Sequence, residues 1–297
     1  MGYRTDRTVK NILSEEFLDR FHRKAHEPIK AVPTHLPTLN RVCRGSGGGI
    51  GFGPIFVTIS GATGNGKSAL ALGFASAALK HGIEGGVCMI NLEMSDIQTA
   101  TRMYAIHTET RIASLEQGNF SDSAFEKARD TMNGSPPLWV PERLLTSWDS
   151  CLAYMNECLE AHGTRYYILD YLQLVSTGTE SEIYATTQKI VTSLRAWGVQ
   201  NEATILCLSQ FNRTTSSNYD QSPRMTGLFG GMILEASSDL VLLLDHSRYR
   251  REGNQAFSYL IVAKNRAGPT LEVPISWDYK TLSCAEGEPH EEHLWPK

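Results

Sequence analysis

Apolar residues recur along the chain in two patterns, one typical of short buried strands and the other of amphipathic helices. Strands are expected at Ile55–Ser60, Val87–Leu92, Leu138–Val140, Tyr166–Leu169, Thr204–Leu208, Leu240–Leu244, Ser258–Ala263 and Leu271–Ser276. Helices are expected at Lys67–His81, Asp96–His107, Asp122–Met132, Ser147–His162 and Ile183–Gln200. Because strands alternate with helices, the pattern predicts an α/β fold with a mostly parallel sheet covered on both faces.

The two ends of the chain depart from this alternation. Asn265–Thr270 is a short, turn-rich connection between the last two strands, so we expect a terminal antiparallel hairpin. Residues 8–25 space their apolar side chains at three and four, which predicts an amphipathic helix, and residues 27–53 have the prolines and glycines of a linker. We therefore expect an N-terminal arm over residues 1–30, one main domain over 31–285 and an acidic tail over 286–297.

Composition places the chain among ordinary globular proteins, with 41% hydrophobic and 20% charged residues. The longest apolar runs are far shorter than the roughly 20 residues that span a bilayer, and no secretory signal is visible, so we expect no membrane segment and a cytoplasmic location. A net charge of −4 shows no overall basic excess for nucleic acid. A ring around a strand needs basic groups only along its channel, so DNA binding stays open.

Six cysteines are spread along the chain without a CxxC pair. Cys151 and Cys158 share a face of one expected helix with His162 four residues further on, which raises the idea of a metal site. No further ligands follow at zinc-site spacing, so reduced, buried thiols are the favoured interpretation.

A phosphate-binding motif supplies the sharpest chemistry. Gly61–Ser68 satisfies G-x-x-x-x-G-K-[ST] and lies between an expected strand and an expected helix. Backbone N–H groups of such a loop face phosphates, the lysine reaches the β- and γ-phosphates, and the hydroxyl binds Mg²⁺. The motif predicts ATP and Mg²⁺ as cofactors, held by Gly61, Gly64, Asn65, Gly66, Lys67, Ser68 and Ala69.

Two acidic residues follow buried strands downstream. Asp170 ends the apolar run that begins at Tyr166, where a carboxylate is well placed to hold Mg²⁺ beside the loop. Glu93 follows the strand Val87–Leu92, which we expect directly next to the P-loop strand in a RecA-type order, and could activate a water. A helix N-cap is the alternative for both residues, and a solvated acid is a further alternative for Glu93.

Several segments together resemble the DnaB-type hexameric replicative DNA helicases. Asn91–Ser95 is similar to the family's strand ending in Leu-Glu-Met, Leu169–Leu174 to its Walker B run and Leu208–Arg213 to its next strand. Ala263–Thr270 resembles its hairpin that reaches across a subunit interface. The matches follow the family's order from residue 55 to 276.

The resemblance implies a RecA-like P-loop core and a role for each matching residue. It implies Glu93 as the catalytic base, Gln210 as the sensor of the γ-phosphate, and Lys264 and Arg266 as groups that act in trans. A solvated basic hairpin is the alternative for this last pair. It also implies a homo-oligomer, expected as a hexameric ring on single-stranded DNA, with a loader or primase as candidate partners.

Two features depart from the family's pattern. Its large N-terminal collar domain has no room here, so we expect a compact form, as from a phage or mobile element, in which residues 8–25 are a linker helix. The region matching its charged DNA loop reads Gly227–Gly231.

DNA contacts are expected in the polar, turn-rich segment Arg213–Arg224, which follows the strand that ends near Gln210. Arg213 and Arg224 could contact phosphates, as could the backbone N–H groups of Gly230 and Gly231, and Phe229 could stack on a base. An ordinary loop or core role is the alternative for each.

Three functions follow in order of preference. The first is an ATP-dependent DNA helicase motor that translocates on single strands and unwinds duplex during replication. The second is a RecA-like or KaiC-like ATP-dependent DNA-binding or regulatory ATPase without unwinding. The third is an interaction partner that hydrolyses little ATP, which the presence of Lys67, Glu93, Asp170 and Gln210 disfavours.

Overall fold

The computed structural model describes residues 31–43, 48–119, 122–170, 180–211, 222–223, 225–228 and 231–288. The expected arm helix over residues 8–25 lies outside these ranges, as do residues 289–297 of the acidic tail and most of the segment expected to contact DNA.

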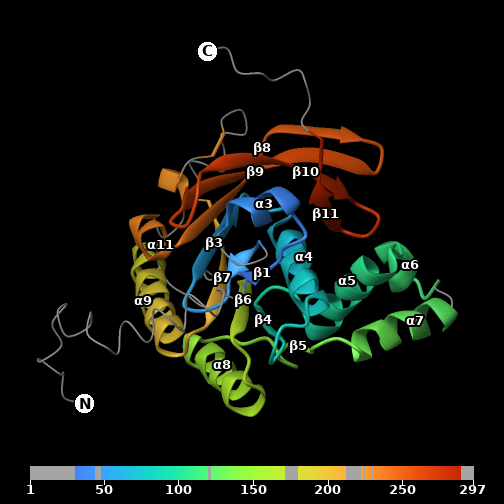
Figure 1. The fold of residues 1–297 in the computed structure, drawn as a ribbon, viewed down its shortest axis with the longest axis horizontal. Coiled ribbons are helices and arrows are strands. Elements are labelled where there is room, and N and C mark those ends of the chain that lie inside the picture. The colour runs from blue at the N-terminus through green and yellow to red at the C-terminus, as the bar shows by residue number, and fades with distance from the viewer. Residues whose placement is uncertain are drawn as a thin grey trace, which may run out of the picture.

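A nine-stranded sheet forms the centre of the molecule, in the order β11-β10-β9-β8-β3-β7-β6-β4-β5 (Figure 1). Six neighbouring strands are parallel: β3 (Phe56–Gly61), β4 (Val87–Asn91), β5 (Leu138–Trp139), β6 (Tyr166–Asp170), β7 (Thr204–Gln210) and β8 (Leu240–Glu252). Three antiparallel strands extend the sheet beyond β8: β9 (Gln255–Asn265), β10 (Leu271–Asp278) and β11 (Ser283–Glu286). The predicted α/β fold with a mostly parallel sheet is confirmed.

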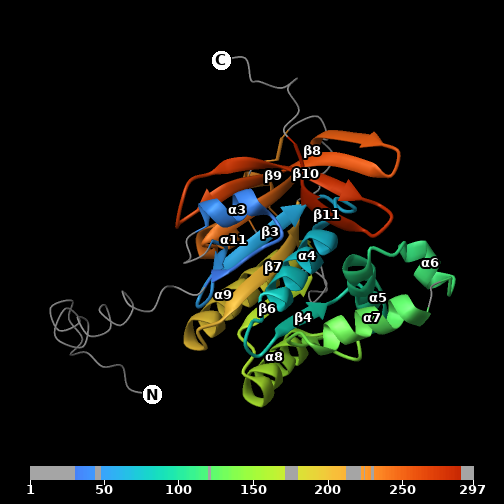
Figure 2. The same ribbon diagram turned by 45° about the vertical axis from the view of Figure 1, so that its right-hand side comes forward.

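Helices cover both faces of the sheet (Figure 2). One face packs on α3 (Pro37–Val42), α4 (Lys67–Lys80) and α5 (Asp96–Thr108), and the other on α8 (Trp148–His162), α9 (Glu180–Gln200) and α11 (Gly231–Ser237). The remaining elements are α6 (Ile112–Glu116), α7 (Asp122–Asn133), the 3-10 turn η2 (Met225–Gly227) and a small antiparallel pair, β1 (Ala31–Val32) with β2 (Ile50–Gly51). Across the described ranges, no helix is both long and apolar enough to cross a membrane.

The alternation of side chains along each strand explains the two layers. In β7, Leu206 and Leu208 enter the core under α4, whereas Ile205 and Cys207 enter the core under α8 and α9. A strand buried on both faces has to be apolar throughout, which is why these strands read as continuous hydrophobic runs. Each fully buried leucine or isoleucine stabilises the fold by about 1.5–3 kcal/mol.

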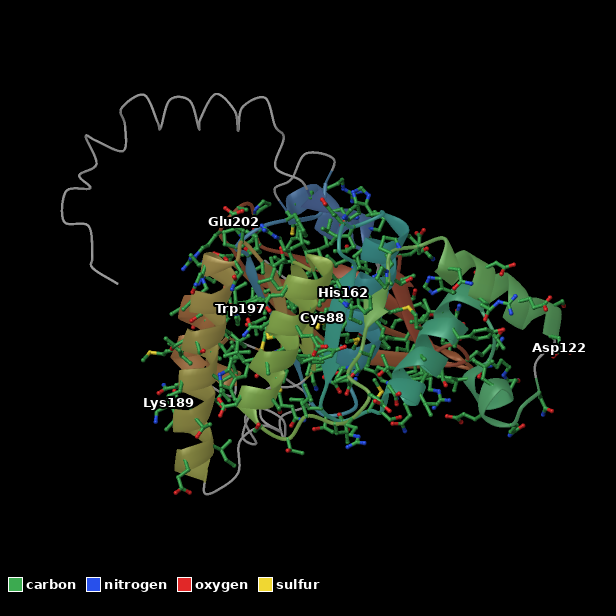
Figure 3. The ribbon with its side chains drawn as sticks, turned by 90° about the horizontal axis from the view of Figure 1, so that it is seen from below. Cys88, Asp122, His162, Lys189, Trp197 and Glu202 are labelled. Atoms are coloured by element: carbon green, nitrogen blue, oxygen red, sulfur yellow. The ribbon has the colours of Figure 1, made fainter. Side chains whose placement is uncertain are left out.

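Four of the six cysteines lie in the core under α8 and α9, where Figure 3 labels Cys88. Cys151 and Cys158 are buried in the same core cluster as Cys88, and all six cysteines of the chain are free thiols. The His162 ring instead stacks on Trp139, with ring centroids 3.6 Å apart. Within the described ranges no group of three or more His, Cys, Asp or Glu side chains is arranged to hold a metal ion.

The antiparallel end of the sheet is wider than the sequence predicts. The expected pairing of the last two long strands is confirmed, with Leu271 opposite Val262. However, β8 continues to Glu252 and also pairs antiparallel with β9, through a register shift between Asp245 and Arg250, and β11 adds an outer strand. The sequence does not predict this extension, because the residues after Leu244 are charged and polar and a strand in an exposed hairpin needs no apolar run.

Candidate active site

The G-x-x-x-x-G-K-[ST] segment forms the turn between β3 and α4. Gly64 and Gly66 have φ of 81° and 83°, in the left-handed region that side chains other than glycine rarely adopt. Gly66 is the residue before the first turn of α4, so the N-terminus of this helix opens directly into the loop. The free N–H groups and the positive dipole end at this point suit an anion.

Lys67 is a buried cation at the base of the loop. Its Nζ donates to the carbonyl oxygens of Gly61 at 3.0 Å and Ala62 at 2.9 Å. Burial lowers the pKa of Lys67, and the carboxylates of Asp170 and Glu93 oppose that shift. The ammonium therefore lies where the loop, the helix end and two acids meet.

Asp170 ends β6 and is 1% exposed. Neither carboxylate oxygen meets the geometry of a hydrogen bond among the described residues; burial raises the pKa of Asp170 to about 6, and the nearby Ser68 hydroxyl and Lys67 ammonium oppose that shift without cancelling it. A buried carboxylate with so little compensation is unfavourable unless a further cation comes to it. Oxygen donors from this carboxylate and from Ser68, which lines the same cavity, match the preference of Mg²⁺.

Glu93 is placed by a turn that follows β4. The side-chain oxygen of Asn91 accepts hydrogen bonds from the N–H of Glu93 at 2.9 Å and of Met94 at 2.7 Å, which curls the chain before α5. Ser95 then caps α5 in a capping box with Gln98. The turn leaves the Glu93 carboxylate exposed at the rim of the cavity.

The expectation that the Glu93 strand lies directly next to the P-loop strand is wrong. The strands β7 and β6 lie between β3 and β4, because strands that come later in the sequence insert between them. Glu93 still reaches the site, since parallel strands end at the same edge of a sheet. The strand that does flank the P-loop strand is β7, whose last residue, Gln210, pairs with Gly61.

One cavity of about 450 Å³ gathers these groups. Its lining includes the expected Gly64, Gly66, Lys67, Ser68, Ala69, Glu93, Asp170 and Gln210. Gly61 and Asn65 belong to the same loop but are buried and do not line the cavity.

Two further groups of residues line the cavity and were not predicted from the sequence. The end of β10 and the turn after it contribute Trp277, Asp278 and Tyr279, while α5 contributes Gln98 and Arg102. The signal for the first group was the aromatic pair at the end of an expected strand. For the second it was the four-residue spacing of Gln98 and Arg102, which puts both on one helix face.

Lys264 and Arg266 do not reach this cavity. The Arg266 guanidinium donates from Nη1 to Asp239 Oδ1 at 3.1 Å and from Nη2 to the carbonyl of Ala236 at 3.0 Å. The Lys264 ammonium donates to the carbonyl oxygen of Glu235. Asp239 hydrogen-bonds the first residue of β3, Phe56, so this basic pair lies at the opposite end of the parallel strands from the P-loop.

The residues expected to contact DNA fall mostly outside the described ranges. These are Arg213, Arg224, Phe229 and Gly230. Gly231 is the first residue of α11. Leu228 nearby is 2% exposed and forms an isolated antiparallel bridge with Phe211.

The chain is similar to replicative helicases in sequence. It is 27% identical over 228 residues to a probable plasmid replicative DNA helicase of Chlamydia psittaci, covering 75% of this chain and 49% of that protein. It is 23% identical over 279 residues to the replicative DNA helicase DnaB of Geobacillus stearothermophilus, covering 91% of this chain and 60% of that protein. The chain thus spans about half to three fifths of the length of these relatives.

Solved structures support the RecA-like fold. One solved ATPase domain superposes with a TM-score of 0.76 at 18% identity, covering 95% of this chain and all of that one. A DnaB-like replicative helicase, described with its interactions with primase, has a TM-score of 0.75 at 19% identity, with 95% and 68% covered. A family model described as the DnaB-like helicase C-terminal domain matches residues 31–285, and the chain belongs to this family.

Proposed function

We propose that this chain is the motor of an ATP-dependent DNA helicase, which translocates on single-stranded DNA and unwinds duplex during replication. The observation that carries the proposal is the convergence of Lys67, Ser68, Glu93, Asp170 and Gln210 on one cavity at the ends of four strands and the start of α4. Each has the chemical type that phosphoryl transfer to water requires. We assign the motor to residues 31–285, flanked by an arm and an acidic tail.

Each residue of the cavity has a distinct task in this proposal. Lys67 exchanges its loop carbonyl partners for the β- and γ-phosphate oxygens of ATP. Ser68 and Asp170 would hold a Mg²⁺, which would neutralise phosphate charge as it develops. Glu93 accepts a proton from the attacking water, and Gln210, next to the loop, contacts the γ-phosphate.

Lys264 and Arg266 would serve the nucleotide of a neighbouring subunit. These two side chains cannot reach a nucleotide in the cavity of their own chain, because the length of β3, about 16 Å at the rise of a strand, separates them from it. An arginine supplied by a neighbour is a large catalytic contribution in related phosphoryl transfers. We therefore propose a ring, expected as a hexamer, with nucleotide at each interface.

Single-stranded DNA is the proposed ligand of the channel, contacted by the segment around Arg213, Arg224 and residues 229–231. A primase is a candidate partner, since one structural relative is described together with primase, and a loader is another. The bacterial cytoplasm, where such DNA replicates, is the proposed place of action.

The test is strand displacement on a forked duplex with ATP and Mg²⁺, alongside ATP hydrolysis, for the wild type, Lys67→Ala and Glu93→Gln. The expected result is displacement by the wild type and none by either variant. Hydrolysis stimulated by single strands without displacement would replace the helicase with the second function, a DNA-binding or regulatory ATPase. Absence of turnover in the wild type would contradict both.

A further inference from the structure

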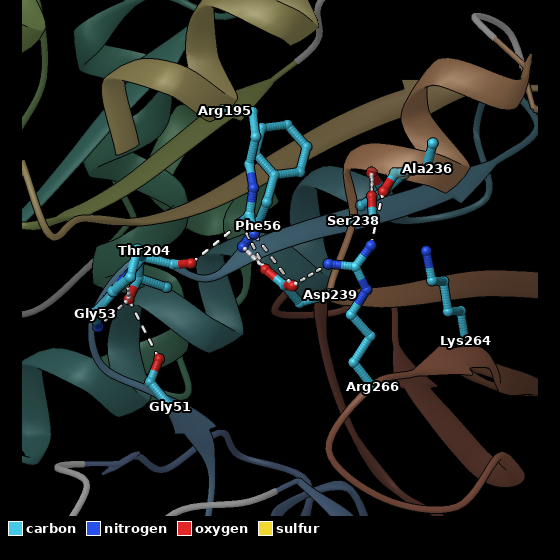
Figure 4. A network of polar contacts seen from close by, with 12 residues as sticks. Gly51, Gly53, Phe56, Arg195, Thr204, Ala236, Ser238, Asp239, Lys264 and Arg266 are labelled. Atoms are coloured by element: carbon cyan, nitrogen blue, oxygen red, sulfur yellow. Dashed lines mark hydrogen bonds and ion pairs between the residues drawn. The ribbon is translucent and has the colours of Figure 1, made fainter. Parts of the chain in front are cut away.

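Asp239 is a nearly enclosed carboxylate between α11 and β8, and three elements meet at it (Figure 4). Its Oδ2 accepts from Arg195 Nη1 of α9 at 2.6 Å and from the N–H of Phe56 at 2.9 Å. Its Oδ1 accepts from Arg266 Nη1 at 3.1 Å and from Arg195 Nη2 at 3.3 Å. The carboxylate is 16% exposed, so neighbouring groups rather than water fix its orientation.

The backbone of the same residue strengthens this junction. The Asp239 N–H donates to the carbonyl of Phe56 at 2.8 Å, and the Arg266 N–H donates to the carbonyl of Asp239 at 2.9 Å. The start of the P-loop strand and the basic hairpin are therefore both bonded to one residue. A movement of the hairpin relative to β3 has to break these bonds.

Arg266 is held at one edge of its guanidinium and exposed at the rest. Nη1 contacts Asp239 and Nη2 contacts the carbonyl of Ala236, while 51% of the side chain is exposed. A guanidinium carries more N–H donors than these contacts use, in a planar fork of fixed geometry. Two contacts on one edge orient that plane and leave the other donors free to face outward.

We propose that Asp239 is the positioning residue for Arg266, which it orients toward the nucleotide of the adjacent subunit. Arg195 and the Phe56 N–H fix the carboxylate, and the carboxylate fixes the guanidinium. The proposal rests on the trans role of Arg266 proposed above and adds the residue that orients its guanidinium. Preorganised donors stabilise a transition state more than mobile ones, because they lose no further freedom when charge develops.

The experiment measures steady-state ATP hydrolysis by Asp239→Asn, alone and mixed with Lys67→Ala subunits. The amide still accepts a hydrogen bond from Phe56 but lacks the charge that holds Arg266. We expect kcat to fall about 10–100-fold, in the range that misplacement of a reacting group produces, with KM changed by less than about 2-fold. Glu202→Gln is the matched control, because it makes the same change in the exposed Arg165–Glu202 ion pair, 3.3 Å long, and should leave kcat unchanged.

Mixing separates a defect in the supplied arginine from a defect in the subunit's own site. Lys67→Ala subunits hydrolyse nothing themselves but carry an intact Arg266 and Asp239. In an equal mixture, about half of the Asp239→Asn sites face such a neighbour across a head-to-tail interface, so turnover per Asp239→Asn site should recover to about half that of the wild type.

Arg266→Ala in the same two assays tests the underlying function separately. Wild-type turnover by Arg266→Ala would remove the trans arginine itself. A different result would be that mixing restores turnover by Arg266→Ala but not by Asp239→Asn. That result would support the trans role of Arg266 and overturn the role of Asp239, because the effect of Asp239→Asn would then act through β3 of its own subunit. Unchanged or faster turnover by Asp239→Asn would overturn the proposal as well.

Discussion

The Trp277 ring packs so closely on Gly66 that a Cβ at residue 66 would lie 2.5 Å from Cζ3 of the indole. The indole is itself fixed, because its Nε1 donates to the Ser258 hydroxyl at 2.6 Å and the side chain is 5% exposed. The antiparallel end of the sheet thus supports the phosphate loop from one side. This contact joins segments more than two hundred residues apart.

Gly66→Ala should therefore both destabilise the fold and weaken ATP binding. The left-handed φ of 83° costs about 1 kcal/mol or more for alanine, and displacement of the indole adds to it. We expect a melting temperature lower by several degrees and ATP affinity reduced more than about 10-fold, measured by calorimetry. Adding Trp277→Ala should restore part of the affinity by relieving the overlap, and a single variant that binds like the wild type would contradict this contact.

Asp170 should make the nucleotide-free protein less stable as pH rises. Its folded pKa of about 6 lies above the ordinary 3.8, so the folded state binds more protons than the unfolded state between about pH 4 and 6. The group consequently costs stability that grows across this window and is complete above it, at most about 3 kcal/mol.

The measurement is urea unfolding of the wild type and Asp170→Asn without nucleotide or Mg²⁺, at about pH 4.5 and 7.5. The variant should gain on the wild type as pH rises, since it has no charge to bury. With ATP and Mg²⁺ the order should reverse, because only the wild type can hold the ion. An equal difference at both pH values would show that burial does not set the ionisation of Asp170.

Glu93→Gln should separate binding from turnover. The carboxylate is exposed at the rim, and the turn that places it depends on the side chain of Asn91, so the amide should leave the fold and ATP affinity intact. Loss of a general base lowers turnover about 10²–10⁴-fold. Glu84→Gln, at an exposed glutamate before the other end of β4, should be silent, and a Glu93→Gln protein that loses ATP binding would assign Glu93 to the nucleotide instead.

The thiols should be inert in the folded protein. Five of the six cysteines are buried, and burial raises the pKa of Cys43 and Cys151 to about 11. Hydrogen bonding with Cys88 and Tyr154 lowers the pKa of Cys158, but its side chain is 2% exposed, so a reagent in solution meets little thiolate near neutral pH. A chromogenic disulfide reagent at about pH 7.5 should react slowly with the native chain and with all six thiols in guanidinium. Fast reaction of more than one thiol in the native protein would contradict this burial.

Most of the site could be predicted because its chemistry is local in sequence. Lys67 and Ser68 belong to one loop, and Glu93 and Asp170 each follow a recognisable buried strand, so pattern and motif suffice. The aromatic wall could not be predicted in this way. Trp277 reaches Gly66 only through the register of β10 on β9 and of β9 on β8, and pairing between distant strands leaves no periodic signal.

Strand order was the other point at which sequence reasoning failed. A hydrophobic run shows that a strand is buried but not which strands flank it, so β4 was expected beside β3, where β7 lies. The extension of β8 past Leu244 failed for the opposite reason, because its polar residues carry no burial signal. Both errors concern how segments meet rather than which segments form.

The separation of Arg266 from the phosphate loop along one sheet gives each subunit a front and a back. Two copies related by a twofold axis could complete each other's sites only if one interface held both the phosphate loop and Arg266 of each copy. Head-to-tail succession instead brings the Arg266 end of one copy to the phosphate loop of the next, and it closes as a ring or continues as a helix. In an open head-to-tail assembly the terminal copy lacks a neighbour to supply Arg266. The number of complete active sites would therefore equal the number of subunit interfaces, not the number of chains.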